Sequence, residues 1–354
     1  MKQGRQANFE LLRIVAMVMI VGLHYLVKGK AVTSPLEDMS VNGYIAWLLE
    51  AFFLVAVNVY VILSGYFGLH MNYSWKRPLR IWGQVWIYSA VIGVICMAVG
   101  IQQFDIYQIF MYMFPTVTEH YWFATAFLLL SICMPFLQAG AVQMEQKTFR
   151  IVLGMFLLFT SISKSILPME LPWDNGGYDV VWFLCLYLTG LYLRRFGLPI
   201  LQGKIWKGFM VYVLGAGLTF ISMVVLSVIY QKTGSLGAMV DYAYTYNHIL
   251  CYMAAIGLFL AFQAMPTDYG KITPMIIKVS SATFGVYLIH EHSNIRYMWP
   301  KWFACEQYAN ASTGSFVLHM VVTVLAVYLI CTGIELLRQV VCKMLWHKCS
   351  FWTK

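Results

Sequence analysis

Long apolar stretches decide the fold of this chain, and the first of them is residues 14–23, Ile-Val-Ala-Met-Val-Met-Ile-Val-Gly-Leu. A helix needs about 20 mostly apolar residues to cross the hydrocarbon core of a bilayer. Runs of this length, with few charges inside them, recur along the whole chain. The sequence therefore predicts an all-α, polytopic membrane protein with about ten transmembrane helices.

The predicted spans follow one another as a single integral membrane domain over residues 1–354. They are 10–28, 44–69, 81–100, 120–138, 150–167, 178–196, 206–230, 247–265, 280–298 and 315–341. The apolar run at 104–114 is too short to cross, so we expect an interfacial or re-entrant segment there. The first span resembles a signal peptide, but it is long, contains Arg13 and His24, and ends without a small-x-small cleavage site. We therefore expect it to be permanent.

The composition agrees with a surface that faces lipid. Of the 354 residues, 60% are hydrophobic and 11% are charged, whereas a soluble domain carries about 25% charged residues. So few charges cannot cover a water-facing surface of this size. No separate soluble domain is expected, and a nucleic-acid partner is excluded because the basic residues have no such domain to lie on.

The placement of the basic residues predicts the orientation. With the N-terminus in the cytoplasm and ten crossings, 17 of the 24 Lys and Arg residues lie in cytoplasmic segments, six lie on the opposite side, and Arg13 lies inside the first span. Short cytoplasmic loops carry the excess of Lys and Arg. Both termini are therefore predicted to be cytoplasmic.

Two ionisable residues stand inside the first span, where such groups are costly and usually functional. Arg13 and His24 are eleven residues apart, about three helical turns, so both are predicted to lie on one face, about 16 Å apart along the axis. Arg13 is then near the cytoplasmic side and His24 past the middle of the membrane. A structural alternative pairs Arg13 with Glu10 and lets His24 hydrogen-bond a neighbouring helix.

The pair Arg13 and His24, with Glu10 three residues before the arginine, resembles the signature of the membrane-bound acyltransferase 3 family. Five further segments resemble elements of the same family in the same order. They are 57–67, which ends Ser-Gly-Tyr-Phe, 75–81 with its basic cluster, 119–123 leading to Pro135, 182–190 ending in glycine, and 281–290, Ser-Ala-Thr-Phe-Gly-Val-Tyr-Leu-Ile-His. The loop after Arg80 lacks a proline common in the family, which leaves only the local geometry there undefined.

This resemblance implies transfer of an acyl group, most often acetyl, from cytoplasmic acyl-CoA to a sugar hydroxyl of a surface glycan or lipid-linked saccharide. Acetyl-CoA is then a co-substrate, and no tightly bound cofactor is expected. Arg13, Arg77 and Arg80 lie on the predicted cytoplasmic side, where their forked donors suit the phosphates of coenzyme A. For Arg77 and Arg80 an alternative role is that of positive-inside anchors. The family also implies a bacterial cytoplasmic membrane.

His24 suits the chemistry that the resemblance implies. A sugar hydroxyl is a poor nucleophile near neutral pH, and an imidazole with an ordinary pKa of about 6.5 is a natural base for it. In one mechanism His24 deprotonates the hydroxyl, which attacks the thioester directly. In the other, His24 carries the acyl group covalently. The sequence does not separate these mechanisms and does not identify the group that stabilises the oxyanion.

Five further side chains are candidates for contacts with the substrates: Glu10, Ser64, His120, Trp122 and His290. Trp122 has an alternative role as a packing or interfacial residue, and Glu119 beside His120 is a further candidate for the glycan. No metal site is expected, because no cysteines have metal-ligand spacing and the histidines of 290–292 are two residues apart, which on a helix do not face together.

Two other classes of function stay open at this point. A secondary transporter also has about ten spans and buried polar groups, and Arg13 and His24 would then line a proton or anion path. No paired inverted repeat between residues 1–170 and 180–354 supports it. A non-catalytic scaffold would not need the two residues aligned. The acceptor, the choice between acetyl and succinyl donors, and the oligomeric state are left undetermined.

Overall fold

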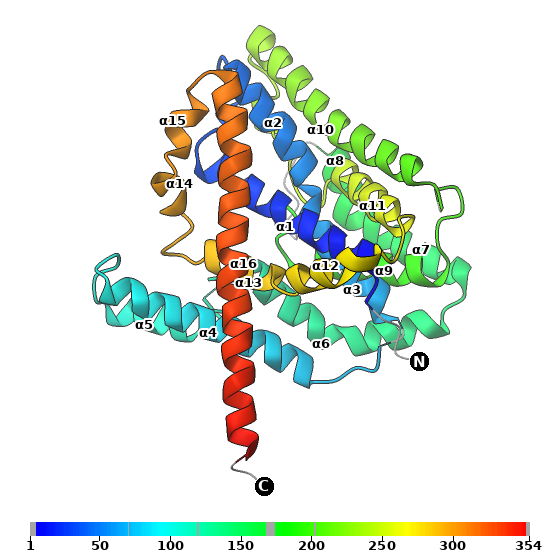
Figure 1. Ribbon diagram of the computed structural model, residues 1–354. Helices are drawn as coiled ribbons and strands as arrows, with labels where there is room; N and C mark the ends of the chain where they lie inside the picture. Colours follow the sequence, from blue (N-terminus) through cyan, green and yellow to red (C-terminus); the bar gives the residue numbers. More distant parts are fainter. Residues whose placement is uncertain (1–4, 70, 119, 168–173, 202, 352–354) are drawn as a thin grey trace.

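The computed structural model describes residues 5–69, 71–118, 120–167, 174–201 and 203–351, the last seven of these by their backbone alone, and every regular element in these ranges is a helix. The α-helices are α1 Ala7–Lys28, α2 Val41–Phe53, α3 Val55–Gly68, α4 Lys76–Ala98, α5 Ile106–Met113, α6 Trp122–Gln143, α7 Gln146–Leu157, α8 Ser163–Ile166, α9 Val180–Arg195, α10 Ile205–Thr233, α11 Ile249–Gln263, α12 Thr273–Ser280, α13 Thr283–His290, α14 Trp299–Trp302, α15 Cys305–Ala309 and α16 Thr313–Phe351. A π-helical turn, Leu158–Ile162, joins α7 to α8. Figure 1 shows their arrangement.

The predicted all-α polytopic membrane fold is confirmed. Eight helical segments of the described chain are long and apolar enough to cross a membrane. They are Ala7–Lys28, Val41–Gly68, Lys76–Ala98, Trp122–Gln143, Gln146–Ile166, Ile205–Thr233, Gly270–His290 and Thr313–Met344. The predicted spans 178–196 and 247–265 correspond to α9 and α11, which are shorter, at 16 and 15 residues. The count of ten crossings therefore stays a prediction.

The ninth predicted span differs most from the sequence-based expectation, and the short apolar run at 104–114 is, as expected, no span. The predicted span 280–298 corresponds to Gly270–His290, because the helix ends at His290 and residues 291–298 form turns. The short apolar run at 104–114 contains α5, which has only eight residues. It packs against α4 at Gly93, where a Cβ atom would lie 2.4 Å from the ring of Tyr112. α5 is therefore a side element of α4 rather than a span of its own.

The helices at the centre approach one another through glycine. α3 and α9 meet at Gly65 and Gly190, where an added Cβ would lie 2.2 Å from the carbonyl oxygens of Tyr187 and Ile62 respectively. Helices in lipid associate by such close packing, since no hydrophobic effect drives them together there. α9 is consequently buried along most of its length despite being too short to rank among the longer spans.

α1 runs through the middle of the bundle, with its first residues against the end of α11 (Figure 1). The side-chain amide of Asn8 donates to the carbonyl oxygen of Phe262, 3.0 Å away, and so satisfies one of the last carbonyls of α11. α12, α13, α3 and α16 also pack against α1. This placement sets the side chains of one face of α1 toward the interior of the bundle.

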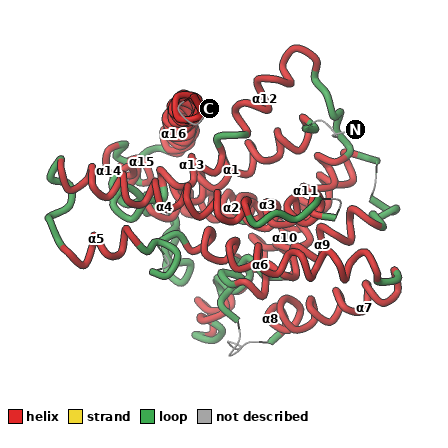
Figure 2. Tube along the Cα trace, turned by 90° about the horizontal axis from the view of Figure 1, so that it is seen from below, coloured by secondary structure: helices red, strands yellow, loops and turns green. Residues whose placement is uncertain are grey.

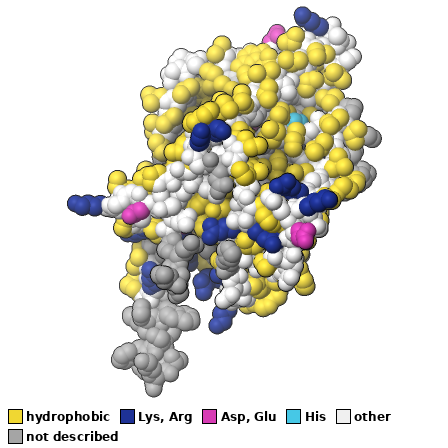
Figure 3. Space-filling view, turned by 90° about the vertical axis from the view of Figure 1, so that its right-hand side faces the viewer, with side chains coloured by type: hydrophobic (Ala, Val, Ile, Leu, Met, Phe, Trp, Pro, Cys, Tyr) yellow, Lys and Arg dark blue, Asp and Glu magenta, His cyan; other side chains and the backbone are white. Residues whose placement is uncertain are grey.

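α16 has a direction of its own. It runs from the top to the bottom of Figure 1, whereas α4 and α6 run across the view, and Figure 2 shows it end-on while those helices lie in the plane. Seen from the side of the N-terminus and of the loop between α9 and α10, Lys and Arg side chains gather over the middle and lower part of an otherwise apolar face (Figure 3). This is the face predicted to be cytoplasmic.

The close approach of α3 and α9 yields a stability prediction. We expect Gly65→Val to lower the thermal unfolding midpoint in detergent, because overpacking of this kind costs roughly 1–3 kcal/mol. Gly217→Val in α10, where an added Cβ meets nothing within 4 Å, is the matched control and should be much milder. Equal effects of the two substitutions would contradict the packing described above.

Candidate active site

A narrow cavity follows the inward face of α1, and both Arg13 and His24 line it. This inner cavity has a volume of about 320 Å³. Tyr60 and Ser64 from α3 and Trp122 from α6 contribute to the same lining. The spacing of Arg13 and His24 in the sequence thus places both side chains in one enclosed space, as helical geometry predicts.

A wider cavity joins the inner one. It has a volume of about 1200 Å³, and Arg5, Arg13, Ser64, Ile81 and Phe127 belong to the linings of both. We call the wider cavity the arginine vestibule, since four arginines line it. They are Arg5, Arg13, Arg77 and Arg194. A space that is wide and basic at the predicted cytoplasmic side therefore narrows toward His24.

Glu10 holds the arginines at the junction of the two cavities. Its buried carboxylate accepts from Arg13 Nη1 at 2.6 Å and lies 3.2 Å from Arg5 Nε. Its other oxygen accepts a hydrogen bond from the Ser280 hydroxyl at the end of α12. The Tyr60 hydroxyl donates to the carbonyl oxygen of Arg13, 2.5 Å away. Arg13 therefore pairs with Glu10, as the structural alternative in the sequence analysis had it. The pairing orients Arg13, which still lines the cavity.

A second histidine determines the tautomer of His24. His290 Nδ1 lies 2.6 Å from the carbonyl oxygen of Val286, and since a carbonyl only accepts, that nitrogen carries the proton. In neutral His290 the Nε2 atom is then an acceptor, and it lies 2.9 Å from His24 Nδ1. His24 must donate from Nδ1, which leaves its Nε2 lone pair free to accept a proton.

Glu291 completes the surroundings of His24. Its Oε2 atom lies 3.1 Å from His24 Nδ1 and accepts from the Lys28 ammonium, and its Oε1 atom lies 3.5 Å from Arg296 Nη1. The carboxylate can accept the Nδ1 proton of His24, and it partly offsets the positive charge that an imidazolium would add beside Lys28 and Arg296. The sequence argument did not select Glu291. Its one signal was its place directly after His290, at a helix end that turns the chain back toward α1.

The nitrogen atoms of His24 and His290 and a carboxylate oxygen of Glu291 lie within 4.8 Å of one another, which is a possible geometry for a metal ion. Their partners do not fit one. The two histidines hydrogen-bond each other, and Glu291 already pairs with the cations Lys28 and Arg296. A metal ion would have to break these contacts, and its charge would then be repelled by the two cations. The donor set therefore fits a proton-transfer arrangement. His292 is not part of it, because its Nε2 atom faces the carbonyl oxygen of Ser89, 3.1 Å away.

The remaining predicted residues divide between the cavities and their surroundings. Ser64 and Trp122 line the inner cavity, and Arg77 lines the arginine vestibule. Arg80 is exposed on α4, one turn after Arg77, and lines neither cavity. His120 also lies outside both linings. Glu119 lies outside the described residues.

His120 belongs to a packed cluster with His292. Their rings are 4.7 Å apart, and His120 Nε2 accepts from the backbone N–H of Ser293 at 3.2 Å. Burial lowers the pKa of His120 to about 3 and that of His292 to about 4. Both lie outside the helical spans and stay neutral, so they brace the turn that carries Glu291.

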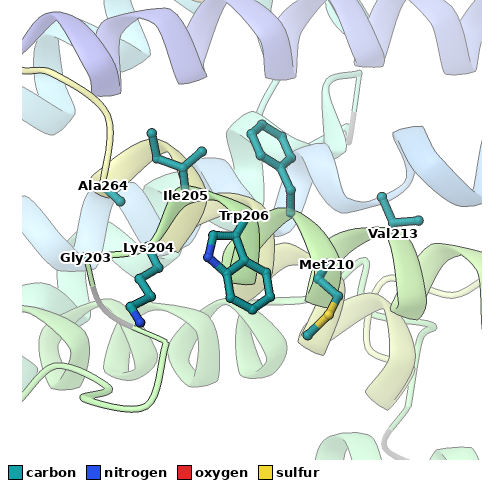
Figure 4. Close-up of a pocket in the computed structure, with 8 residues that line it drawn as sticks. Gly203, Lys204, Ile205, Trp206, Met210, Val213 and Ala264 are labelled. Atoms are coloured by element: carbon teal, nitrogen blue, oxygen red, sulfur yellow. The ribbon is translucent and has the colours of Figure 1, made fainter.

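A separate hollow lies along the start of α10 (Figure 4). It has a volume of about 930 Å³, and Lys204, Trp206, Met210 and Ala264 are among the residues that line it. Lys204 is the one ionisable group in this lining, so it offers no acid–base pair. Trp206 is 60% exposed, which indicates an open surface groove. The chemistry therefore centres on His24.

A comparison with protein families gives evidence that is independent of the geometry around Arg13 and His24. A family model described as an acyltransferase domain matches residues 6–334. The chain belongs to the acyltransferase 3 family. No match was found among curated proteins or among solved structures. Membership implies a multi-pass membrane acyltransferase, and the match covers α1 with Arg13 and His24 as well as α13 with His290.

The neutral histidine cluster of this acyltransferase predicts an acid-sensitive fold. A histidine whose pKa falls from 6.5 to about 3 in the folded state contributes stability that is complete above pH 6.5 and is lost as the pH falls below it. We expect the thermal unfolding midpoint to fall as the pH drops from about 7 to about 5. The fall should be smaller in His120→Gln, which keeps an acceptor for Ser293 but does not titrate. Equal slopes would contradict the neutral state of His120.

Proposed function

We propose that this acyltransferase moves an acyl group, most simply acetyl, from cytoplasmic acyl-CoA to a hydroxyl group of an extracytoplasmic or lipid-linked glycan. One observation carries the proposal: an arginine-lined vestibule narrows into a cavity that contains a histidine with a free Nε2 lone pair. Coenzyme A has the matching shape, a charged nucleotide end on a thin pantetheine arm. The family resemblance supports a bacterial cytoplasmic membrane as the location.

The donor enters from the arginine vestibule in this proposal. Arg13 and Arg77 bind the phosphates of coenzyme A, because their forked donors match phosphate oxygens. Arg80 lies one helical turn beyond Arg77 and extends the basic surface outside the cavity, toward the nucleotide. Glu10 acts through Arg13 by fixing its orientation. The pantetheine arm occupies the inner cavity and brings the thioester to His24.

His24 acts as the general base of the transfer. Its Nε2 atom takes the proton of the acceptor hydroxyl, and the hydroxyl oxygen attacks the thioester carbonyl carbon. The C–S bond breaks, and the coenzyme A thiolate leaves with the proton that the imidazolium returns. His290 holds His24 in the required tautomer, and Glu291 stabilises the imidazolium.

A covalent route uses the same atoms in two steps. The Nε2 atom of His24 attacks the thioester carbonyl carbon, the C–S bond breaks, and the coenzyme A thiolate leaves an acyl-imidazolium behind. The acceptor hydroxyl then attacks the acyl carbon, the bond from this carbon to Nε2 breaks, and the hydroxyl proton passes to Nε2 and from there to solvent. Isolation of an acyl-histidine enzyme in the absence of acceptor would favour this route. Ser64 and Trp122 contact the substrates in either route, because both line the inner cavity.

The central test is acyl transfer in membranes supplied with radiolabelled acetyl-CoA. Wild-type membranes should label a glycan fraction, and His24→Ala should reduce the label by at least about 10²-fold, since loss of a general base costs that much. Full activity of His24→Ala would remove His24 from the mechanism. Solute flux with no acyl transfer by the wild type would instead identify a transporter.

Two variants of His290 sharpen this test. His290→Gln keeps an acceptor for His24 Nδ1 and should retain more activity than His290→Leu, in which the tautomer of His24 is no longer held. Thermal unfolding of both variants controls for loss of fold. If His290 only fills space, His290→Gln should not be more active than His290→Leu.

The arginine vestibule predicts an effect on the donor alone. Arg13→Ala and Arg77→Ala should each raise the KM for acetyl-CoA about tenfold, as expected for the loss of a charge-assisted phosphate contact. Lys147→Ala, an exposed cation that lines neither cavity, is the control and should leave that KM unchanged. An unchanged KM in both arginine variants would place the nucleotide elsewhere.

A further inference from the structure

We propose that a basic pocket beyond the end of α1 binds an acidic group, a phosphate or a carboxylate, of the acceptor glycan. This inference rests on the proposed function and adds that the acceptor is an acidic glycan, held at the end of α1 that lies opposite the arginine vestibule. The pocket has a volume of about 710 Å³ and is called the outer basic pocket below.

The outer basic pocket lies between the end of α1 and the segment that carries α14 and α15 (Figure 1). Lys28 is the last residue of α1 and lies one helical turn, about 6 Å, beyond His24. The arginine vestibule, in contrast, meets α1 in its first two turns. Among the described residues, three lysines, one carboxylate and two side-chain amides line the pocket: Lys28, Lys30, Lys301, Glu306, Gln307 and Asn310. The lining therefore combines an excess of positive charge with amides that hydrogen-bond sugar hydroxyls.

The positive charge of the outer basic pocket is only partly neutralised within the protein. Lys30 donates to Glu306 at 2.9 Å, but this pair is open to water, with 69% of the Lys30 side chain exposed. Exposed pairs of this kind contribute little to stability. Lys301 is exposed, and it has no ion pair with any carboxylate that the structure describes. An incoming anion therefore reaches two ammonium groups without displacing a buried partner.

So many cations are unexpected at this side of a membrane protein. The predicted topology puts only six Lys and Arg residues outside, where such residues are depleted. Four of the six lie in or beside the outer basic pocket. Lys28 and Arg296 are accounted for, because both pair with the buried Glu291. Lys30 and Lys301 serve no buried carboxylate of the described chain, and a ligand with negative charge supplies a reason for them.

The backbone is strained at two walls of the outer basic pocket. Lys30 and Ala304 have φ angles of 58° and 53°, in the left-handed region that favours glycine. They are two of the three non-glycine residues with a positive φ angle in the part of the chain that the structure describes. A helix usually ends with glycine in this conformation, whereas here a lysine adopts it after Gly29. Such strain is concentrated at binding and catalytic sites, so it agrees with a binding role for these walls.

One ion pair separates the outer basic pocket from the catalytic histidine. Lys28 lines the pocket and donates to Glu291, whose Oε2 atom lies 3.1 Å from His24 Nδ1. An acidic group bound at Lys30 and Lys301 holds the glycan close to His24 without occupying the inner cavity. A hydroxyl group of the same glycan, near the acidic group along the chain, is then the one that reacts.

The type of cation decides the class of ligand. Lysine ammonium groups act as point charges that bind phosphate and carboxylate oxygens alike. The outer basic pocket therefore selects negative charge rather than one kind of acid. A neutral glycan would have only the amides Gln307 and Asn310 to bind, and Lys301 would stay without a partner.

The test measures acceptor saturation in membranes that receive saturating radiolabelled acetyl-CoA and glycan extracted from the expressing cells. The double variant Lys30→Gln/Lys301→Gln should raise the acceptor concentration at half-maximal rate about tenfold, as the loss of charge-assisted contacts predicts. Glu306→Gln should lower that concentration, because it removes the one carboxylate among the described lining residues. The maximal rate and the KM for acetyl-CoA should stay close to wild type in all of them.

Salt and small competitors show whether the pocket recognises charge. Sodium chloride should raise the half-saturating acceptor concentration of the wild type, because it screens exposed charges, and should raise it less in the double variant. Glucose 6-phosphate and glucuronate are the competing probes for a phosphate and a carboxylate, with glucose as their control. The acid that matches the acceptor should inhibit the wild type more strongly than the double variant. Inhibition no stronger than that by glucose would contradict the proposal.

Lys232→Gln is the matched control, because Lys232 is an exposed cation of the same predicted side that lies outside the pocket lining. It should change nothing, and thermal unfolding of each variant checks the fold. If the double variant saturates at the wild-type acceptor concentration, or Glu306→Gln raises that concentration, the outer basic pocket does not bind the acceptor, while the acyltransfer proposal stands. If wild-type membranes label no glycan at all, the proposed function fails, and this inference fails with it.

Discussion

Charged side chains inside a hydrocarbon layer are stable only where opposite charges or hydrogen-bond donors meet them. Three buried glutamates satisfy this condition across helix boundaries. Glu10 joins α1 to Ser280 of α12, Glu291 joins the turn after α13 to the end of α1, and Glu335 joins α16 to Tyr88 of α4. Because each carboxylate needs its partners, the helices around the inner cavity are held in one arrangement, and the cavity depends on that arrangement.

The same requirement accounts for the asymmetry of the cavity. Four arginines line the wider cavity at the predicted cytoplasmic side, two of them paired with Glu10, and a polyanionic donor there would meet their positive charge. At the other end, Trp122 and Tyr246 line the cavity, and Glu291 partners the cations near His24. A reaction between a charged donor and a neutral hydroxyl fits this division, since each substrate meets the surface that suits its charge.

Part of the site could be predicted from the sequence because it lies within one helix. Arg13 and His24 share a face of α1 by the helical period alone, and both line one cavity. His290 was found by its resemblance to a family element, but its contact with His24 spans 266 positions and no local pattern predicts it. Glu291 was missed because its role arises where α13 ends and the chain turns back toward α1. His120 was predicted near the substrates, whereas the structure packs it against His292.

The sequence by itself determined that this protein lies in a membrane and which face of α1 carries Arg13 and His24, because hydropathy and helical period are properties of consecutive residues. The orientation of its basic loops stays a prediction. The end of the ninth predicted span eight residues earlier than expected, the pairing of His24 with His290 and Glu291, and the meeting of Lys28, Lys30 and Lys301 at one pocket were decided only by the tertiary structure. These contacts depend on how closely helices approach, and that distance is set by residues such as Gly65 and Gly190 and by the partners that buried charges require.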